Sequence, residues 1–111
     1  MKFTQLGAFE ELVLLTVGVL DDDAYGVSIK AEIENRTGRT SSIGAMHSAL
    51  SRLEEKGFIR SHEGGATASR GGRRKRFFLL TGAGKAALVS SHELRQGMLR
   101  DIPDLGLSFQ F

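Results

Sequence analysis

The segment that most constrains the fold runs from Leu6 to Leu20, because it is apolar on more than one face of any helix it could form. A long run of this kind predicts a helix, and a helix that is apolar nearly all round must be buried on two sides. In a single domain of 111 residues, we expect one side to face the core and the other a second subunit. The apolar residues are Leu6, Phe9, Leu12, Val13, Leu14, Leu15, Val17, Val19 and Leu20.

A second helix is predicted to start near Ala24, directly after three consecutive acids. Asp21 to Asp23 supply an N-cap and favourable negative charge for a helix start. Arg36 followed by Gly38 is the usual arrangement at a helix end. The core-facing residues of this helix are Ile29 and Ile33, one turn apart.

A third helix is predicted from Ile43 to Lys56, capped by Ser41 or Ser42 and ended by Gly57. Spacings of three and four residues place Ile43, Met46, Leu50 and Leu53 on one apolar stripe. The opposite face is small and polar, and carries Gly44, His47, Ser48, Ser51, Arg52 and Glu55.

Two extended segments follow, Phe58 to Glu63 and Arg73 to Leu80, and they predict a β-hairpin. The residues between them, 64–72, are mostly Gly, Ala, Ser and Thr, so we expect a long mobile tip. Thr81 caps a last helix that Pro103 limits. Residues 104–111 alternate in hydrophobicity, and their structure is left open as a strand, a packed tail or disorder.

The bulk composition excludes several classes of protein. The chain has no cysteine, which removes disulfides, thiolate catalysis and most structural zinc sites and fits a cytoplasmic location. No apolar run is long enough to cross a bilayer, and the N-terminus does not read as a signal peptide. No Ser, His and acid form a recognisable catalytic pattern, and His47, His62 and His92 lack metal-ligand spacing. We expect no enzyme activity, no metal and no cofactor.

The net charge of +2 conceals an uneven distribution. The segment from Arg60 to Arg76 holds six basic residues and one acid, whereas the other 94 residues hold nine bases and twelve acids. A basic hairpin on a slightly acidic body indicates local binding of an anion such as DNA, although a solvated charged hairpin is the plain alternative. The basic residues nearest the tip are Arg70, Arg73, Arg74 and Lys75.

Two helices joined by a short turn and followed by a basic hairpin are the plan of a winged helix-turn-helix. The second helix of such a pair enters the major groove with its N-terminal end against base edges. The predicted DNA contacts from that helix are Ser41, Ser42, Gly44, His47, Ser48 and Arg52.

Three of these side chains have plain alternatives. His47 contacts a base or is a solvated helix residue. Arg52 reaches a phosphate or pairs with Glu54 or Glu55. Tyr25 touches phosphate from the start of the second helix or packs within the protein, and packing is slightly favoured.

Several motifs follow one another along the chain: Leu6-Gly7, Leu12–Leu15, Asp23–Ile29, Ser42–Gly44, Leu50–Ile59 and Gly72–Gly84. In order and spacing they resemble the short forms of the PadR-like transcriptional regulators, and the resemblance covers roughly residues 6–90. His47 stands where the family usually has a tyrosine, so the resemblance implies the fold but not the family's operator sequence. Phe78 stands where the family often has a tyrosine.

The resemblance implies a homodimeric, usually repressing, DNA-binding protein that can release DNA on meeting a small molecule. It also implies dimerisation through the final helix with help from the first. This agrees with apolar side chains that the domain leaves uncovered, and the expected interface residues are Leu12, Leu88, Leu94, Met98 and Ile102.

The expected fold is mainly α with one small β-hairpin. Residues 1–80 form the winged helix-turn-helix region, 81–103 the dimerisation helix and 104–111 the tail. The expected function is sequence-specific regulation by a homodimer on a palindromic operator, with an apolar small molecule as effector. The apolar first and last helices can line a pocket for that molecule at the dimer interface. The competing interpretation is a winged-helix module that binds protein and not DNA. The basic hairpin argues against it, because protein interfaces are depleted in lysine.

Overall fold

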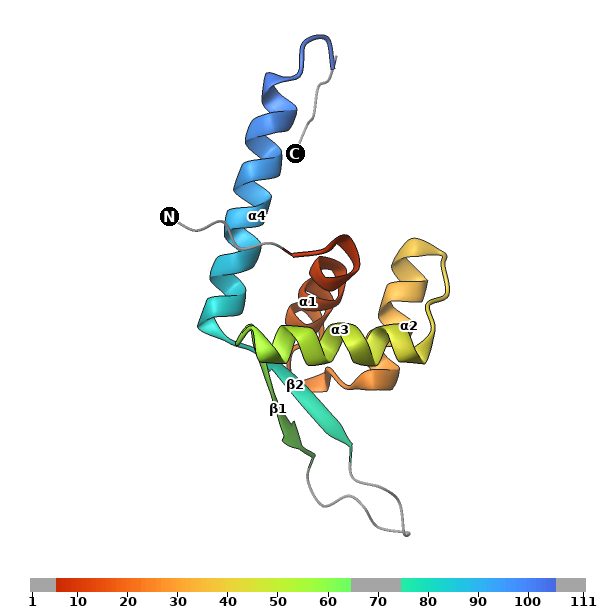
Figure 1. Cartoon of the computed structure of the whole chain (residues 1–111). Helices are drawn as coiled ribbons and strands as arrows, with labels where there is room; N and C mark the ends of the chain where they lie inside the picture. The colour runs from red at the N-terminus through yellow and green to blue at the C-terminus, as the bar shows by residue number, and fades with distance from the viewer. Residues whose placement is uncertain (1–5, 65–74, 106–111) are drawn as a thin grey trace.

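The computed structural model describes residues 6–64 and 75–105. The first three α-helices pack together, and the described residues form one two-stranded sheet. Figure 1 shows the hairpin projecting from the packed helices at one end and the long final helix projecting from the other. The predicted order of three helices, a hairpin and a last helix is confirmed. The elements are α1 (Ala8–Leu20), a short 3-10 helix η1 (Asp21–Asp23), α2 (Gly26–Thr37), α3 (Ile43–Glu55), β1 (Ile59–Glu63), β2 (Arg76–Leu80) and α4 (Gly82–Asp101).

The core forms around α1, which contacts α2, α3, β2 and α4. Both predicted core residues of α2 and three of the four on α3 are buried. The fourth residue of the apolar α3 stripe, Ile43, is 51% exposed, so the stripe is buried at three of its four positions. Ile43 is the first residue of α3. The largest fully buried side chains are Leu14, Ile29, Met46, Leu53, Ile59, Val13 and Val17.

The start of α2 differs from the sequence prediction. Asp21 to Asp23 form η1 instead of capping the helix, and Tyr25 is the N-cap residue. The Ser28 hydroxyl accepts a hydrogen bond from the Tyr25 backbone N–H at 3.0 Å and donates to the Asp23 carbonyl at 2.5 Å. This serine therefore joins η1 to α2, and it satisfies a donor that would otherwise be free at the helix start.

The other predicted caps are confirmed. Ser42, one of the two serines proposed for α3, accepts from the Ala45 N–H at 3.0 Å. Gly38 ends α2 with φ of 72°, a left-handed conformation that favours glycine. Helix α4 ends at Asp101, two residues before Pro103.

Strands β1 and β2 pair antiparallel, with Ile59 opposite Leu80 and Glu63 opposite Arg76. Ala24 and Tyr25, directly before α2, pair with β2 along the edge that β1 does not occupy. Tyr25 forms an antiparallel bridge with Phe77, and the Phe78 N–H donates to the Ala24 carbonyl at 2.8 Å. The hairpin is thus anchored on both sides, by α3 through the β1 connection and by the η1–α2 segment.

Helix α4 starts with a closely fitted junction. The Thr81 hydroxyl accepts from the Gly84 N–H at 3.0 Å and donates to the Gly57 carbonyl at 2.7 Å. Gly84 packs so tightly that an added Cβ would lie 2.2 Å from the Phe58 carbonyl oxygen. This junction fixes the direction in which α4 leaves the body. In the part of the chain that the structure describes, no helix is long and apolar enough to cross a membrane.

Candidate nucleic-acid interface

The outward face of α3 is open along its N-terminal half. Gly44, His47 and Ser48 are exposed, as is the capping Ser42. Within the described residues, none of the Gly44, His47 or Ser48 side-chain positions is engaged by another part of the protein. Small residues allow close approach of the helix backbone to a groove, and the free N–H groups at a helix start favour anions. Four of the predicted contacts of this helix therefore share one accessible surface.

The C-terminal half of α3 is instead tied to α1 by a buried acid. Glu10 is buried, and its carboxylate binds the Lys56 ammonium at 2.8 Å and the Arg52 guanidinium at 2.5 Å. The pairing of Arg52 with Glu54 or Glu55 considered from the sequence is therefore wrong, and the partner is Glu10. A phosphate contact from the half-exposed Arg52 side chain stays a prediction.

These contacts change the acidity of Glu10. The hydrogen bond from Lys56, together with those from Arg52 and the Gly7 backbone, outweighs the opposite effect of burial and lowers the pKa of Glu10 from 4.5 to about 2. Glu10 therefore stays ionised at all but strongly acidic pH, and it holds two cations of α3 in place. The sequence analysis did not single out Glu10. The available signal was its position on the inward face of α1, one turn before Val13 and Leu14.

A second acid of α3 fixes the hairpin. Glu54 accepts from Arg76 at 3.0 Å and from the Ser61 hydroxyl at 2.8 Å, and Arg76 also donates to Ser61 at 2.9 Å. These three residues come from α3, β1 and β2. They set the angle between the third helix and the hairpin, which are the two elements expected to contact DNA.

Tyr25 packs against the hairpin, as the favoured interpretation of the sequence expected. Its ring lies 5.3 Å from that of Phe77, and the Lys75 ammonium lies 4.3 Å from the Tyr25 ring centroid. On the other side, the His62 ring stacks on Phe77 at 5.8 Å. A cation over an aromatic face is attracted to it. Lys75 is thereby oriented directly before β2, at the end of the paired strands farther from α3, and it remains exposed.

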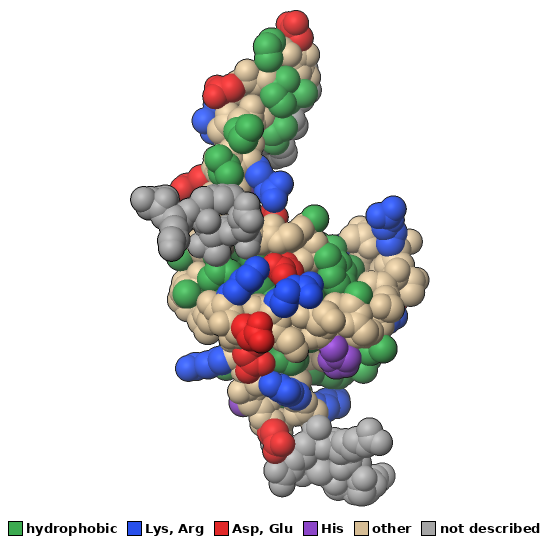
Figure 2. All heavy atoms as spheres, in the orientation of Figure 1, with side chains coloured by type: hydrophobic (Ala, Val, Ile, Leu, Met, Phe, Trp, Pro, Cys, Tyr) green, Lys and Arg blue, Asp and Glu red, His purple; other side chains and the backbone are tan. Residues whose placement is uncertain are grey.

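The other predicted hairpin contacts, Arg70, Arg73 and Arg74, lie outside the described residues, as does the predicted mobile tip. Arg60 on β1 is exposed. Figure 2 shows basic side chains on the hairpin side of the molecule as well as acidic ones near the middle. No group of three His, Asp or Glu side chains among the described residues could hold a metal ion.

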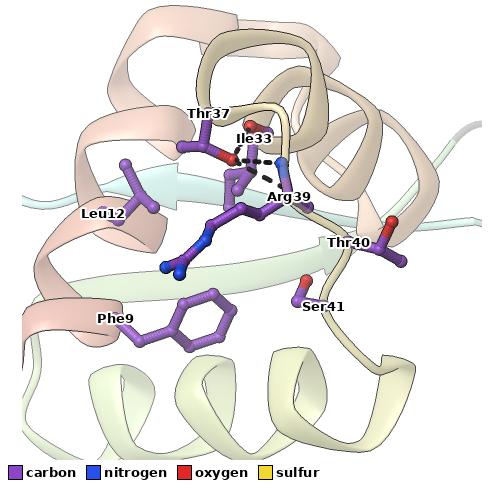
Figure 3. A pocket seen from close by; sticks show the side chains of 7 residues that line it. All are labelled: Phe9, Leu12, Ile33, Thr37, Arg39, Thr40 and Ser41. Carbon is purple, nitrogen blue, oxygen red and sulfur yellow. Dashed lines mark hydrogen bonds between the residues drawn. The ribbon is translucent and has the colours of Figure 1, made fainter.

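A cavity of about 310 Å³ lies between α1, the end of α2 and the turn into α3. In Figure 3 the Arg39 side chain extends across it toward Phe9. The Ser41 hydroxyl is buried and has no hydrogen-bond partner among the described residues. This location differs from the pocket between the first and last helices that the sequence analysis considered. The residues lining it include Phe9, Leu12, Ile33, Thr37, Arg39 and Ser41.

The predicted dimer residues fall into two groups. Leu12 and Leu88 are half-buried and pack against the core of their own chain. Leu94, Met98 and Ile102 are exposed along the projecting half of α4. Figure 2 shows hydrophobic side chains gathered on this part of the molecule. The middle of α4 is held to α1, because Glu11 accepts from Ser91 at 2.9 Å and pairs with Arg95 at 3.0 Å.

Three packed helices with a hairpin wing anchored beside the third helix define a winged helix-turn-helix protein, a DNA-binding class. The chain belongs to the PadR-like family of transcriptional regulators, whose family model it matches over residues 14–90. The family and its solved members are regulators of transcription and not enzymes.

The chain is also similar to individual proteins and solved structures. The chain is 38% identical over 72 residues to uncharacterized protein X of Lysinibacillus sphaericus, and the match covers 63% of each chain, less than two thirds of that relative's length. It superposes on a PadR family transcription regulator of Clostridium difficile with a TM-score of 0.65 at 28% identity, covering 85% of this chain and 96% of that one. For RosR of H. salinarum in the hsRosR-S4 complex, the TM-score is 0.70 at 26% identity, covering 90% and 79%.

Proposed function

We propose that this PadR-like regulator acts as a homodimeric repressor that binds a palindromic operator. The observation that carries the proposal is the division of α3 into two halves. Its C-terminal half is held by Glu10 and Glu54 against α1 and the hairpin. Its N-terminal half presents unengaged small polar side chains to solvent. A helix fixed at one end and open at the other can dock its open end in a major groove without reorganising.

The wing contributes affinity in this proposal. Lys75 is exposed and oriented by Tyr25, and the basic residues Arg73 and Arg74 directly precede it in the chain. Contacts of such side chains to phosphates fix register and release counterions, but they carry little sequence information. Specificity then rests on α3, with His47 as a base-contacting residue.

The second subunit is inferred from the uncovered apolar stripe of α4. Leu94, Met98 and Ile102 recur every fourth residue, and each is exposed in the single chain. Such a stripe is stabilised by a partner helix. A two-fold dimer places two α3 helices in successive major grooves, so the half-site centres of the operator lie roughly 34–36 Å apart.

The proposal includes relief by a small apolar effector, which the cavity beside α2 and α3 supports. Phe9, Leu12 and Ile33 give it apolar walls. It adjoins the turn that leads into α3, so a ligand there that prefers the DNA-free form weakens DNA binding by the same coupling free energy. A panel of small apolar compounds, screened by thermal shift and then for loss of DNA affinity, tests this part. If no compound lowers the DNA affinity, the protein is a constitutive repressor.

Fluorescence anisotropy tests the main proposal. Labelled duplexes from the DNA upstream of the protein's own coding region are compared with an unrelated duplex at two salt concentrations. We expect tight, salt-dependent binding that prefers the upstream DNA. The double variant Arg73→Ala/Arg74→Ala should bind all duplexes more weakly with a smaller salt slope, whereas His47→Ala should change the ranking of sites. No binding even at low salt would favour the protein-interaction module.

A further inference from the structure

Ile43 is exposed although the periodicity of α3 places it on the apolar stripe of the helix. It is the first residue of the helix and is 51% exposed, whereas Met46, Leu50 and Leu53 on the same stripe are buried. In the first turn of α3, residues 43–46, it is the one large hydrophobic side chain that is exposed. The packing of this protomer therefore does not account for a branched apolar side chain at this position.

The surroundings of Ile43 are polar and small. Gly44 follows it, and an added Cβ there would meet nothing within 4 Å. His47 lies one turn further along and is exposed, and residues four apart share a helix face. Ser42 precedes it with its oxygen engaged in the N-cap. Ile43 is thus an apolar projection at the open end of α3, beside the side chains proposed to contact base edges.

We propose that Ile43 recognises thymine in the operator by packing against its 5-methyl group. This rests on the proposed function, in which the open end of α3 enters the major groove. Among the groups that base pairs present there, the thymine methyl is the apolar one, and the others are hydrogen-bond donors and acceptors. The N-terminal residues of a recognition helix are those that reach base edges. An isoleucine can form no hydrogen bond, so a methyl is the feature it can select.

Val27 provides a matched control in the same region. It lies in the first turn of α2 and is 68% exposed, so it is an apolar side chain of the same kind at the start of a neighbouring helix. In a helix-turn-helix, the first helix of the pair crosses the sugar–phosphate backbone instead of entering the groove. Val27 therefore meets no base methyl.

The test begins with a duplex selected from a random pool by the full-length protein. Each thymine is then replaced singly by deoxyuridine, which removes the methyl group and leaves base pairing intact. We expect one position in each half-site where the replacement weakens binding about fourfold, the size expected for one buried methyl group. The Ile43→Ala variant should bind the duplex with thymine at that position and the duplex with uracil there equally tightly. Val27→Ala should keep the full preference for thymine, and Ile43→Val should keep most of it.

The outcomes separate this inference from the function on which it rests. If the pool yields no preferred duplex, the proposed function itself fails. If the protein selects a duplex but no uracil replacement weakens its binding, thymine recognition is wrong while sequence-specific binding stands. A thymine preference that survives in Ile43→Ala assigns the methyl contact to another residue and overturns the role of Ile43. Since Ile43 and Val27 are both exposed, unchanged circular dichroism spectra are expected for all three variants.

Discussion

The carboxylate of Glu10 binds the guanidinium of Arg52 across the interface between α1 and α3, 42 residues apart in the chain. The neighbouring Glu11 points to α4, where it binds Ser91 and Arg95. Two consecutive acids in the first turn of α1 thus hold the proposed recognition helix and the proposed dimerisation helix. The relative position of two functional surfaces depends on one short segment.

Replacing Glu10 should cost more stability than replacing Glu11. The Glu10 side chain is 9% exposed, so Glu10→Gln leaves two cations without their counter-charge and should lower the free energy of unfolding by about 2 kcal/mol. Arg95, the partner of Glu11, is largely exposed, so Glu11→Gln should lower it by less than about 1 kcal/mol. Urea unfolding at pH 7 measures both variants. Equal losses would show that burial of Glu10 adds nothing to its ion pairs.

Glu10 should also make stability depend on acid. Its folded pKa of about 2 lies below the unfolded value of 4.5. The ionised Glu10 carboxylate therefore contributes its full stabilisation to the folded state above about pH 5. This stabilisation is lost as the pH falls toward 2. Between pH 5 and pH 2.5, the free energy of unfolding should fall more in the wild type than in Glu10→Gln. The gap in unfolding free energy between the two proteins should therefore narrow. Urea titrations at these two pH values check this, and a constant gap would contradict it.

The elements that depend on local sequence were predictable from it. Ser42 caps α3 and Thr81 caps α4 because a side-chain oxygen reaches an N–H only three residues away. The end of α2 at Gly38 follows from equally local chemistry, because glycine readily adopts the left-handed φ found there. The start of α2 is the exception, because Ser28 inside the helix satisfies the Tyr25 N–H and the preceding acids are taken into η1.

The features that depend on contacts distant in sequence were not predictable in the same way. The period of α3 identifies which face of the helix is apolar, but it does not show that Ile43 is exposed while Met46 in the same turn is buried. The partner of Arg52 was sought within its own helix, whereas α1 packs against that helix and supplies Glu10. Periodicity places Glu10 on the inward face of α1, yet only the tertiary arrangement shows which cations meet it.

Two adjacent serines should respond oppositely to the same change. Ser42→Ala removes the N-cap of α3 and should lower the free energy of unfolding by about 1 kcal/mol. The buried Ser41 hydroxyl has no hydrogen-bond partner within residues 6–64 and 75–105, so Ser41→Ala should leave stability unchanged or raise it slightly. Urea unfolding of the two variants in one buffer is the comparison. A loss in Ser41→Ala as large as that in Ser42→Ala would show that the Ser41 hydroxyl is hydrogen-bonded.

Two glycines at the start of α4 form a second matched pair. Gly82→Ala meets nothing within 4 Å, so it should be neutral or stabilise by up to about 1 kcal/mol through the reduced entropy of the unfolded chain. Gly84→Ala would place a Cβ against the Phe58 carbonyl and should cost about 1–3 kcal/mol. Thermal unfolding followed by circular dichroism measures both. Similar melting temperatures would mean that the junction between α4 and the β1 connection is loose.

The face of α4 that binds the second subunit can be identified by two substitutions on opposite sides of the helix. Met98 is 64% exposed within the apolar stripe of Leu94 and Ile102, and Val89 is 55% exposed nine residues earlier, half a turn away from that stripe. A charge in an apolar interface is costly. Met98→Glu should therefore shift the protein from dimer to monomer and weaken operator binding, whereas Val89→Glu should leave the dimer intact.

Sedimentation velocity measures the oligomeric state of both variants, and fluorescence anisotropy measures their DNA affinity. Both variants should stay folded because both side chains are exposed in the single chain. Dissociation by Val89→Glu with a stable Met98→Glu dimer would assign the interface to the opposite face of α4.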